Sequence, residues 1–185
     1  MSEPLEAFVF INFLQALRFG HIAWGFSTGP DKYLFGSADH LLKRPMWDLP
    51  ALLGYSHVEP GGDIDFWVNE GSLAYMLDDL TTGKHIRYHS AKRILVLSPQ
   101  PEAARQCALS LSEGGWSLMQ NNCLHHTIRV LTAFGLPRES MPETSLLKPL
   151  TMVPVHWFAN IEGETVDLRA RLNNPLAKRT LGNHG

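Results

Sequence analysis

The segment HIAWGFSTGPDKYLFGS, residues 21–37, contains two short runs of aromatic and small residues around a polar turn. Apolar side chains at every second position favour a strand that buries one face. Residues 28–31, TGPD, separate the two runs with residue types that favour tight turns. The segment therefore predicts a β-hairpin, with strands at 21–27 and 32–37, within an antiparallel sheet.

Other segments supply further strands and helices around this hairpin. Short apolar runs predict strands at 63–68 (DIDFWV) and 93–98 (RILVLS), and helical patterns predict helices at 70–80, 101–112 and 122–134. We therefore expect an α+β fold in which a small antiparallel sheet packs against helices. Residues 1–172 are expected to form one domain, and residues 173–185 a flexible polar tail.

The composition limits the classes of function. The chain has 185 residues, 44% of them hydrophobic and 18% charged, which is typical of one globular domain with a sizeable core. A formal net charge of −2 creates no broad field that would attract nucleic acid or acidic membranes. Two cysteines are too few for a disulfide framework or a cysteine-rich zinc site.

The apolar N-terminal region does not resemble a signal peptide. Glu3 and Glu6 stand where a basic region would be, and no small-residue cleavage site follows. The apolar run at 7–19 is too short and too polar to span a bilayer. We expect no transmembrane segment and a cytoplasmic location, although export without a signal would leave no trace. The oligomeric state is left open.

Cys123 lies at the start of a predicted helix in NNCLHHTIRVLTAFG, residues 121–135. Asn122 is a favourable N-cap, which would put Cys123 at the first helical position. Unpaired N–H groups and the helix dipole favour an anion there, and this lowers the pKa of a thiol. Cys123 is therefore a candidate nucleophile, whereas Cys107 lies in an apolar helical pattern typical of a core residue.

A nucleophilic cysteine needs a base, and His21 is the best candidate. On a strand, His21, Ala23 and Gly25 share one face, which is almost bare after the imidazole. Small side chains allow a helix to approach closely. We therefore expect the helix that begins at Cys123 to pack on this bare face.

A third group should orient the imidazole by accepting its other N–H. In the predicted hairpin, His21 lies opposite Ser37, Ala38 or Asp39, so the third group is Asp39 or Ser37. A shift of one residue decides between them. Asn121 or Asn122 is a candidate second donor to an oxyanion, beside the backbone N–H of Cys123.

The motifs GHIAWGF and NNCLHHTIRVLTAFG resemble those of circularly permuted papain-like cysteine hydrolases, a group that includes the lecithin:retinol acyltransferase-like and permuted NlpC/P60 proteins. The resemblance implies a papain-like core in permuted order, with His21 as base and Cys123 as nucleophile. It gives His125 a structural or second-shell role. Two positions depart from the family pattern: Leu124 replaces an acidic residue, and Gly36 falls at the third-group position.

The resemblance implies hydrolysis or transfer of an amide or ester acyl group, with no metal or organic cofactor. The substrate would be a small molecule, a peptide or peptidoglycan fragment, or a lipid-like ester. A catalytically inactive binding module on the same scaffold is the alternative.

Histidine pairs and apolar loops raise two further possibilities. A metal site is disfavoured, because no HExxH motif or carboxylate partner accompanies the pairs His85/His89 and His125/His126. The apolar segments 40–62 and 146–158 either converge beside Cys123 as a cleft for a large apolar group or complete the core.

Overall fold

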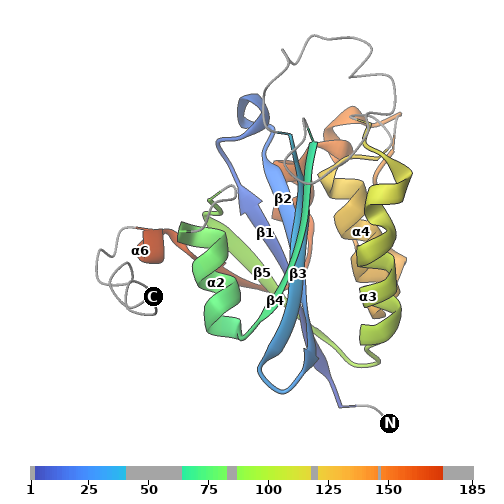
Figure 1. Cartoon of the computed structure of the whole chain (residues 1–185). Coiled ribbons are helices and arrows are strands. Elements are labelled where there is room, and N and C mark those ends of the chain that lie inside the picture. The colour runs from blue at the N-terminus through green and yellow to red at the C-terminus, as the bar shows by residue number, and fades with distance from the viewer. Residues whose placement is uncertain (1–2, 41–63, 83–86, 118–120, 146, 173–185) are drawn as a thin grey trace.

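The computed structural model describes residues 3–40, 64–82, 87–117, 121–145 and 147–172. They form an antiparallel sheet with helices on both faces (Figure 1). The strand order is β4-β3-β2-β1-β5-β6. The strands are β1 (Leu5–Asn12), β2 (His21–Gly29), β3 (Lys32–His40), β4 (Ile64–Gly71), β5 (Ser90–Val96) and β6 (Glu164–Asp167). The predicted α+β class and the hairpin at 21–37 are confirmed.

Helices lie on the two sides of this sheet. One face carries α3 (Pro101–Ser110), α4 (Cys123–Phe134) and α5 (Pro154–Asn160). The other face carries α2 (Leu73–Thr82) and the short α6 (Arg169–Leu172). Figure 1 shows this arrangement for α2, α3, α4 and α6. Short 3-10 turns are η1 (Ala16–Arg18), η2 (Leu111–Gly114), η3 (Arg138–Ser140) and η4 (Pro149–Met152). The predicted helices at 70–80, 101–112 and 122–134 thus correspond to α2, to α3 with η2, and to α4.

Strand β1 is central in the sheet, although the sequence did not predict it as a strand. It pairs with β2 on one side and with β5 on the other, and residues 7–12 are all buried. A strand covered on both faces is apolar throughout and lacks the alternation that identifies a half-buried strand. The edge strand β6 was also missed, because its four residues are mostly exposed and carry no apolar pattern.

The face of β2 that packs on α4 is the opposite of the expected one. Trp24 and Phe26 lie in one core with α4, and the rings of Phe26 and Phe134 are 5.0 Å apart. Ala23 lies in the other core with Met76 of α2, and a Cβ on Gly25 would lie 2.9 Å from the Met76 sulfur. The expectation that the bare face receives the Cys123 helix is therefore wrong, because the amphipathic α4 packs on the larger apolar surface.

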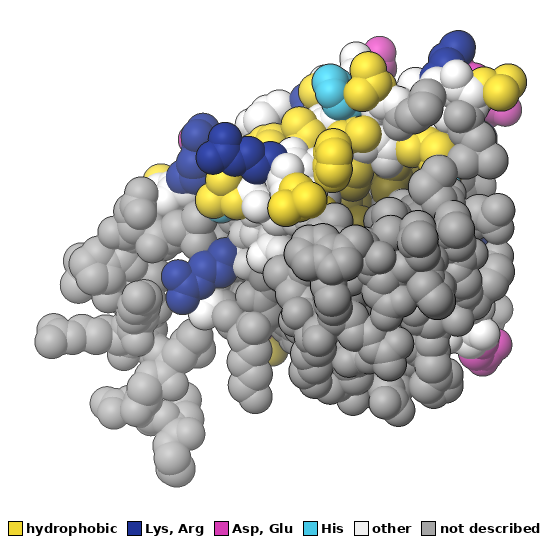
Figure 2. Space-filling view, turned by 90° about the horizontal axis from the view of Figure 1, so that it is seen from above, with side chains coloured by type: hydrophobic (Ala, Val, Ile, Leu, Met, Phe, Trp, Pro, Cys, Tyr) yellow, Lys and Arg dark blue, Asp and Glu magenta, His cyan; other side chains and the backbone are white. Residues whose placement is uncertain are grey.

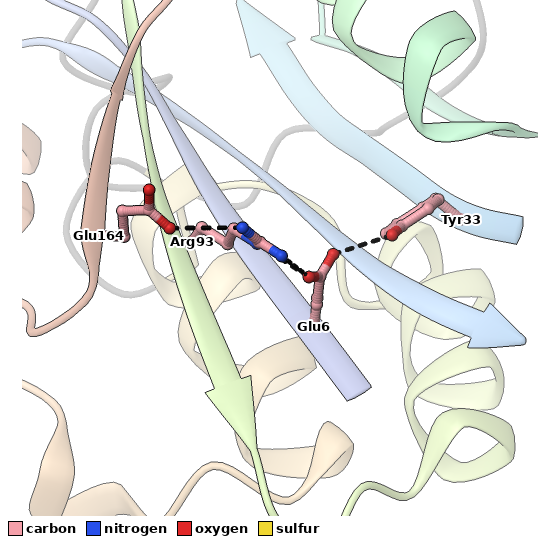
Figure 3. A network of polar contacts seen from close by, with 4 residues as sticks. All are labelled: Glu6, Tyr33, Arg93 and Glu164. Carbon is pink, nitrogen blue, oxygen red and sulfur yellow. Dashed lines mark hydrogen bonds and ion pairs between the residues drawn. The ribbon is translucent and has the colours of Figure 1, made fainter. Parts of the chain in front are cut away.

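A polar network crosses the α2 face of the sheet (Figure 3). The Tyr33 hydroxyl donates to Glu6 over 2.9 Å, and the Arg93 guanidinium donates to both Glu6 and Glu164. Burial, and then the hydrogen bond to Glu6, raise the pKa of Tyr33 to about 12. The residues come from β3, β1, β5 and β6, so the network ties strands together and has no feature of a catalytic site.

The apolar segment at 146–158 forms η4 and most of α5. Trp157 and Phe158 are buried in the α4-side core, and the Trp157 indole donates to the Pro142 carbonyl. These two residues complete the core. The other apolar segment, 40–62, and the tail at 173–185 lie outside the described residues except for His40, so the proposed cleft stays a prediction.

Gly135 caps the C-terminal end of α4, and replacing this glycine by alanine should destabilise the fold by about 1–3 kcal/mol. Gly135 has a φ of +107°, and a Cβ there would collide with the Ser98 carbonyl oxygen. Urea unfolding measures the loss. Gly29→Ala is the matched control, because nothing lies within 4 Å of a Cβ at Gly29. Equal unfolding midpoints for the two variants would contradict the prediction.

Candidate functional site

Cys123 is the first residue of α4, as the sequence predicted. The Asn122 Oδ1 accepts hydrogen bonds from the backbone N–H of Leu124 at 2.9 Å and of His125 at 3.2 Å, which confirms Asn122 as the N-cap. Cys123 is 9% exposed, so its sulfur belongs to a largely enclosed environment. The positive end of the helix dipole favours an anion at this position.

His21 and Ser37 form a buried polar pair. The His21 Nε2 lies 2.9 Å from the Ser37 Oγ, and the Ser37 hydroxyl donates to the Ile22 carbonyl over 3.0 Å. A hydroxyl has one proton, so Ser37 can only accept from His21. The Nε2 of His21 therefore carries a proton, and in the neutral imidazole Nδ1 carries the lone pair.

The Ser37 hydroxyl contacts the His21 ring, whereas the side chain of Asp39 lies outside what the structure describes, so Asp39 as the third group stays a prediction. The observed register pairs Trp24 with Gly36, and extending it by three residues puts Asp39 opposite His21. The hydrogen bond nevertheless runs diagonally to Ser37, which lies on the same face of the sheet. The backbone of Asp39 pairs with Asp65 of β4.

The start of α4 and the start of β2 lie at the same end of the sheet, the upper end in Figure 1. Trp116, which precedes α4, packs against Ala38 near the end of β3. Ser117 and Asn121 then form an isolated β-bridge just before the helix. Because Ala38 follows Ser37 on β3, Trp116 lies beside the strand whose Ser37 contacts the His21 ring.

The imidazole and the cysteine helix approach this end from different sides of the sheet. The centroid of the His21 ring lies 6.0 Å from that of Tyr88, which belongs to the α2-side core. Helix α4 packs on the other face. The structure thus joins His21 to Ser37, and the pairing of His21 with the Cys123 thiol stays a prediction.

The two asparagines before Cys123 have structural hydrogen bonds. The Asn121 amide nitrogen donates to the carbonyls of Gly114 at 3.1 Å and Gly115 at 2.7 Å, which uses both of its protons. The Asn122 oxygen caps α4. The Asn121 amide therefore has no proton left for an oxyanion, whereas the cap uses only the oxygen of Asn122, so Asn122 as an oxyanion donor stays a prediction.

The adjacent histidines of α4 differ in environment. His125 lies with its Nδ1 3.0 Å from the Asn122 Oδ1, which agrees with the structural role implied by the resemblance, and burial lowers the pKa of its imidazole. His126 is 1% exposed, and neither ring nitrogen has a hydrogen-bond partner in the described part of the chain. Burial, with smaller effects from Arg129 and His125, lowers the pKa of His126 to about 4.

Sequence reasoning missed the burial of His126. Helical spacing could have indicated this burial. Val130 lies four residues further along α4, on the same face as His126, and is also fully buried. The other cysteine, Cys107, is partly buried against the α4-side core as predicted, and burial raises the pKa of its thiol.

Among the described residues, no group of three His, Cys, Asp or Glu side chains could hold a metal ion. Nor does any helix in the described ranges have the length and apolar character needed to cross a membrane. No protein-family model, curated protein or solved structure matches the chain.

Proposed function

We propose that the chain is a cysteine-dependent hydrolase or acyltransferase that acts on an amide or ester bond. Cys123 is the nucleophile, and His21 is the base that takes its proton at Nδ1. The observation that carries the proposal is the hydrogen-bond chain from His21 Nε2 through the Ser37 hydroxyl to the Ile22 carbonyl. This chain selects the tautomer that a base facing a thiol requires.

Ser37 acts as a positioning residue. A neutral hydroxyl orients the ring, but it stabilises an imidazolium less than a carboxylate would. The positive end of α4 supplies the complementary effect, because it stabilises the Cys123 thiolate. Together these effects favour a Cys123 thiol that loses its proton to His21 more readily than an ordinary thiol does.

The reaction forms a thioester between the Cys123 sulfur and the acyl carbon. The bond from that carbon to the leaving nitrogen or oxygen breaks, and the His21 imidazolium returns its proton to the leaving group. Water then attacks the thioester in a hydrolase, whereas an alcohol or amine attacks it in an acyltransferase. A peptide amide, a peptidoglycan-type isopeptide and a lipid ester all satisfy this chemistry.

Selective alkylation tests the activated thiol. At about pH 6, iodoacetamide should label Cys123 at least about tenfold faster than Cys107, because an ordinary thiol is almost fully protonated there. Cys107→Ser should keep the fast label, and Cys123→Ser should lose it, as followed by mass spectrometry of the adduct. Equally slow labelling of both cysteines would overturn the proposal and favour an inactive binding module on this scaffold.

A further inference from the structure

The loop between β1 and β2, residues 13–20, exposes large apolar side chains. Leu14 is 68% exposed, Leu17 74% and Phe19 53%. Scattered surface leucines are common, but three apolar side chains within six residues of one loop form a contiguous feature. Such a feature on a well-packed protein indicates an interaction surface.

The loop holds these side chains in an unfavourable backbone conformation. Ala16, Leu17 and Arg18 have φ values of 50°, 55° and 70°, in the left-handed region that residues other than glycine avoid. The Gly20 N–H donates to the Gln15 carbonyl over 3.1 Å, and the Val155 N–H donates to the Phe19 carbonyl over 3.1 Å. A strained loop that its surroundings hold in place is a reason to look for a function of the side chains that it presents.

The apolar surface continues onto the segment that leads into α5. Leu150 is 66% exposed and Leu147 93% exposed, and they lie five and eight residues before Val155, whose backbone N–H donates a hydrogen bond to the loop. Figure 2, which looks down on this end of the molecule, shows hydrophobic side chains gathered beside Lys and Arg side chains, with a few Asp and Glu side chains at the edge. We call Leu14, Leu17, Phe19, Leu147 and Leu150 the apolar rim.

Two arginines give the apolar rim a local positive charge. Arg18 belongs to the loop, and the Arg87 carbonyl accepts a hydrogen bond of 2.7 Å from Asn12, where the loop begins. Both arginines are exposed, and neither forms an ion pair with any residue that the structure describes. Residues 13–20 contain no acidic side chain, so the charge at this loop is positive although the chain as a whole is not.

We propose that the apolar rim docks on the surface of an anionic lipid bilayer. The leucines and Phe19 would enter the boundary between headgroups and acyl chains, while Arg18 and Arg87 would meet lipid phosphates. Exposed leucines beside arginines that pair with no described residue fit an anionic apolar surface better than a second copy of the chain. In a two-fold contact between copies, the same arginines would face one another across the interface.

The docking proposal does not rest on the proposed chemistry. Docking would bring the end of the sheet that carries His21 and the start of α4 close to the bilayer. The Cys123→Ser variant should nevertheless bind vesicles as well as the wild type. Lost labelling of Cys123 with intact vesicle binding would overturn the proposed enzyme alone.

Vesicle flotation tests the apolar contribution. The wild type should float with phosphatidylcholine vesicles that contain about 30% phosphatidylserine, and less with phosphatidylcholine alone. Leu17→Asp should weaken binding by about tenfold or more, because it removes an apolar side chain that would enter the bilayer and adds a negative charge that the anionic lipids repel. Aspartate tolerates the left-handed backbone at this position, so the variant should fold. Leu109→Asp is the matched control, since Leu109 is 54% exposed on α3.

Charge variants test the electrostatic contribution. Arg18→Asn and Arg87→Gln should each weaken binding to anionic vesicles by about fivefold, and about 0.5 M salt should weaken binding of the wild type. The proposal is overturned if the wild type does not bind anionic vesicles or if Leu17→Asp binds as well as Leu109→Asp. It is also overturned if sedimentation shows a wild-type dimer that Leu17→Asp converts to monomers and vesicles bind neither protein.

Discussion

His21→Ala should slow acylation of Cys123 by an activated ester by about 10²–10⁴-fold, the usual contribution of a positioned general base. The wild-type reaction should depend on one group that must be deprotonated, and this dependence should disappear in the variant. Added imidazole should restore part of the rate, because alanine leaves room for it. Stopped-flow detection of the released alcohol measures the burst for both proteins.

Ser37→Ala is the companion variant and should slow the same reaction by about tenfold, because one hydrogen bond to the ring is lost. Its pH profile should also change shape, since the tautomer is no longer selected by the hydroxyl. A purely structural role for Ser37 would lower the unfolding midpoint and leave the pH profile unchanged. If His21→Ala acylates at the wild-type rate while remaining folded, His21 is not the partner of the thiol.

As the pH falls toward 4, the wild type should lose about 3 kcal/mol of its free energy of unfolding through His126. The variant His126→Leu should not show this loss. The pKa of His126 is about 4 in the folded protein, below the ordinary value of 6.5. Between these values the unfolded chain binds more protons at this position than the folded protein does. The free energy of unfolding therefore rises with pH across this window, and the contribution is lost as the pH falls toward 4.

The leucine variant should also be more stable near neutral pH by about 1 kcal/mol or more, because both ring nitrogens of His126 are buried without partners in the described residues. Urea unfolding at several pH values between about 4 and 7 measures both effects. The control His156→Gln changes an exposed histidine of α5 and should keep the wild-type pH dependence. An unchanged slope in His126→Leu would contradict the assignment.

Local signals predicted much of the candidate site. Alternating residues around TGPD predicted the hairpin that holds His21, and the Asn122 side chain predicted the start of α4 at Cys123. These features depend on neighbours within a few residues along the chain, where backbone sterics and hydrogen bonds determine the outcome. Strand β1 was not predicted, because burial on both faces removes the alternation of apolar and polar residues on which such predictions depend.

The long-range arrangement required the tertiary structure. The sequence showed that one face of β2 is small and the other large, but not that α2 would cover Ala23 and Gly25 while α4 covered Trp24 and Phe26. Both α2 and α4 are amphipathic, so either helix could cover either face of β2. Only the packing of the whole chain decides which helix covers which face.

The amino-acid sequence by itself determined the hairpin at 21–37 and the start of α4 after its cap at Asn122. The tertiary structure decided that Ser37 contacts the imidazole and that neither ring nitrogen of His126 has a partner among the described residues. The physical reason is the separation along the chain between the residues that interact. Caps and turns are satisfied within one turn of chain, whereas a diagonal cross-strand contact and the burial of one helix face depend on residues distant in sequence.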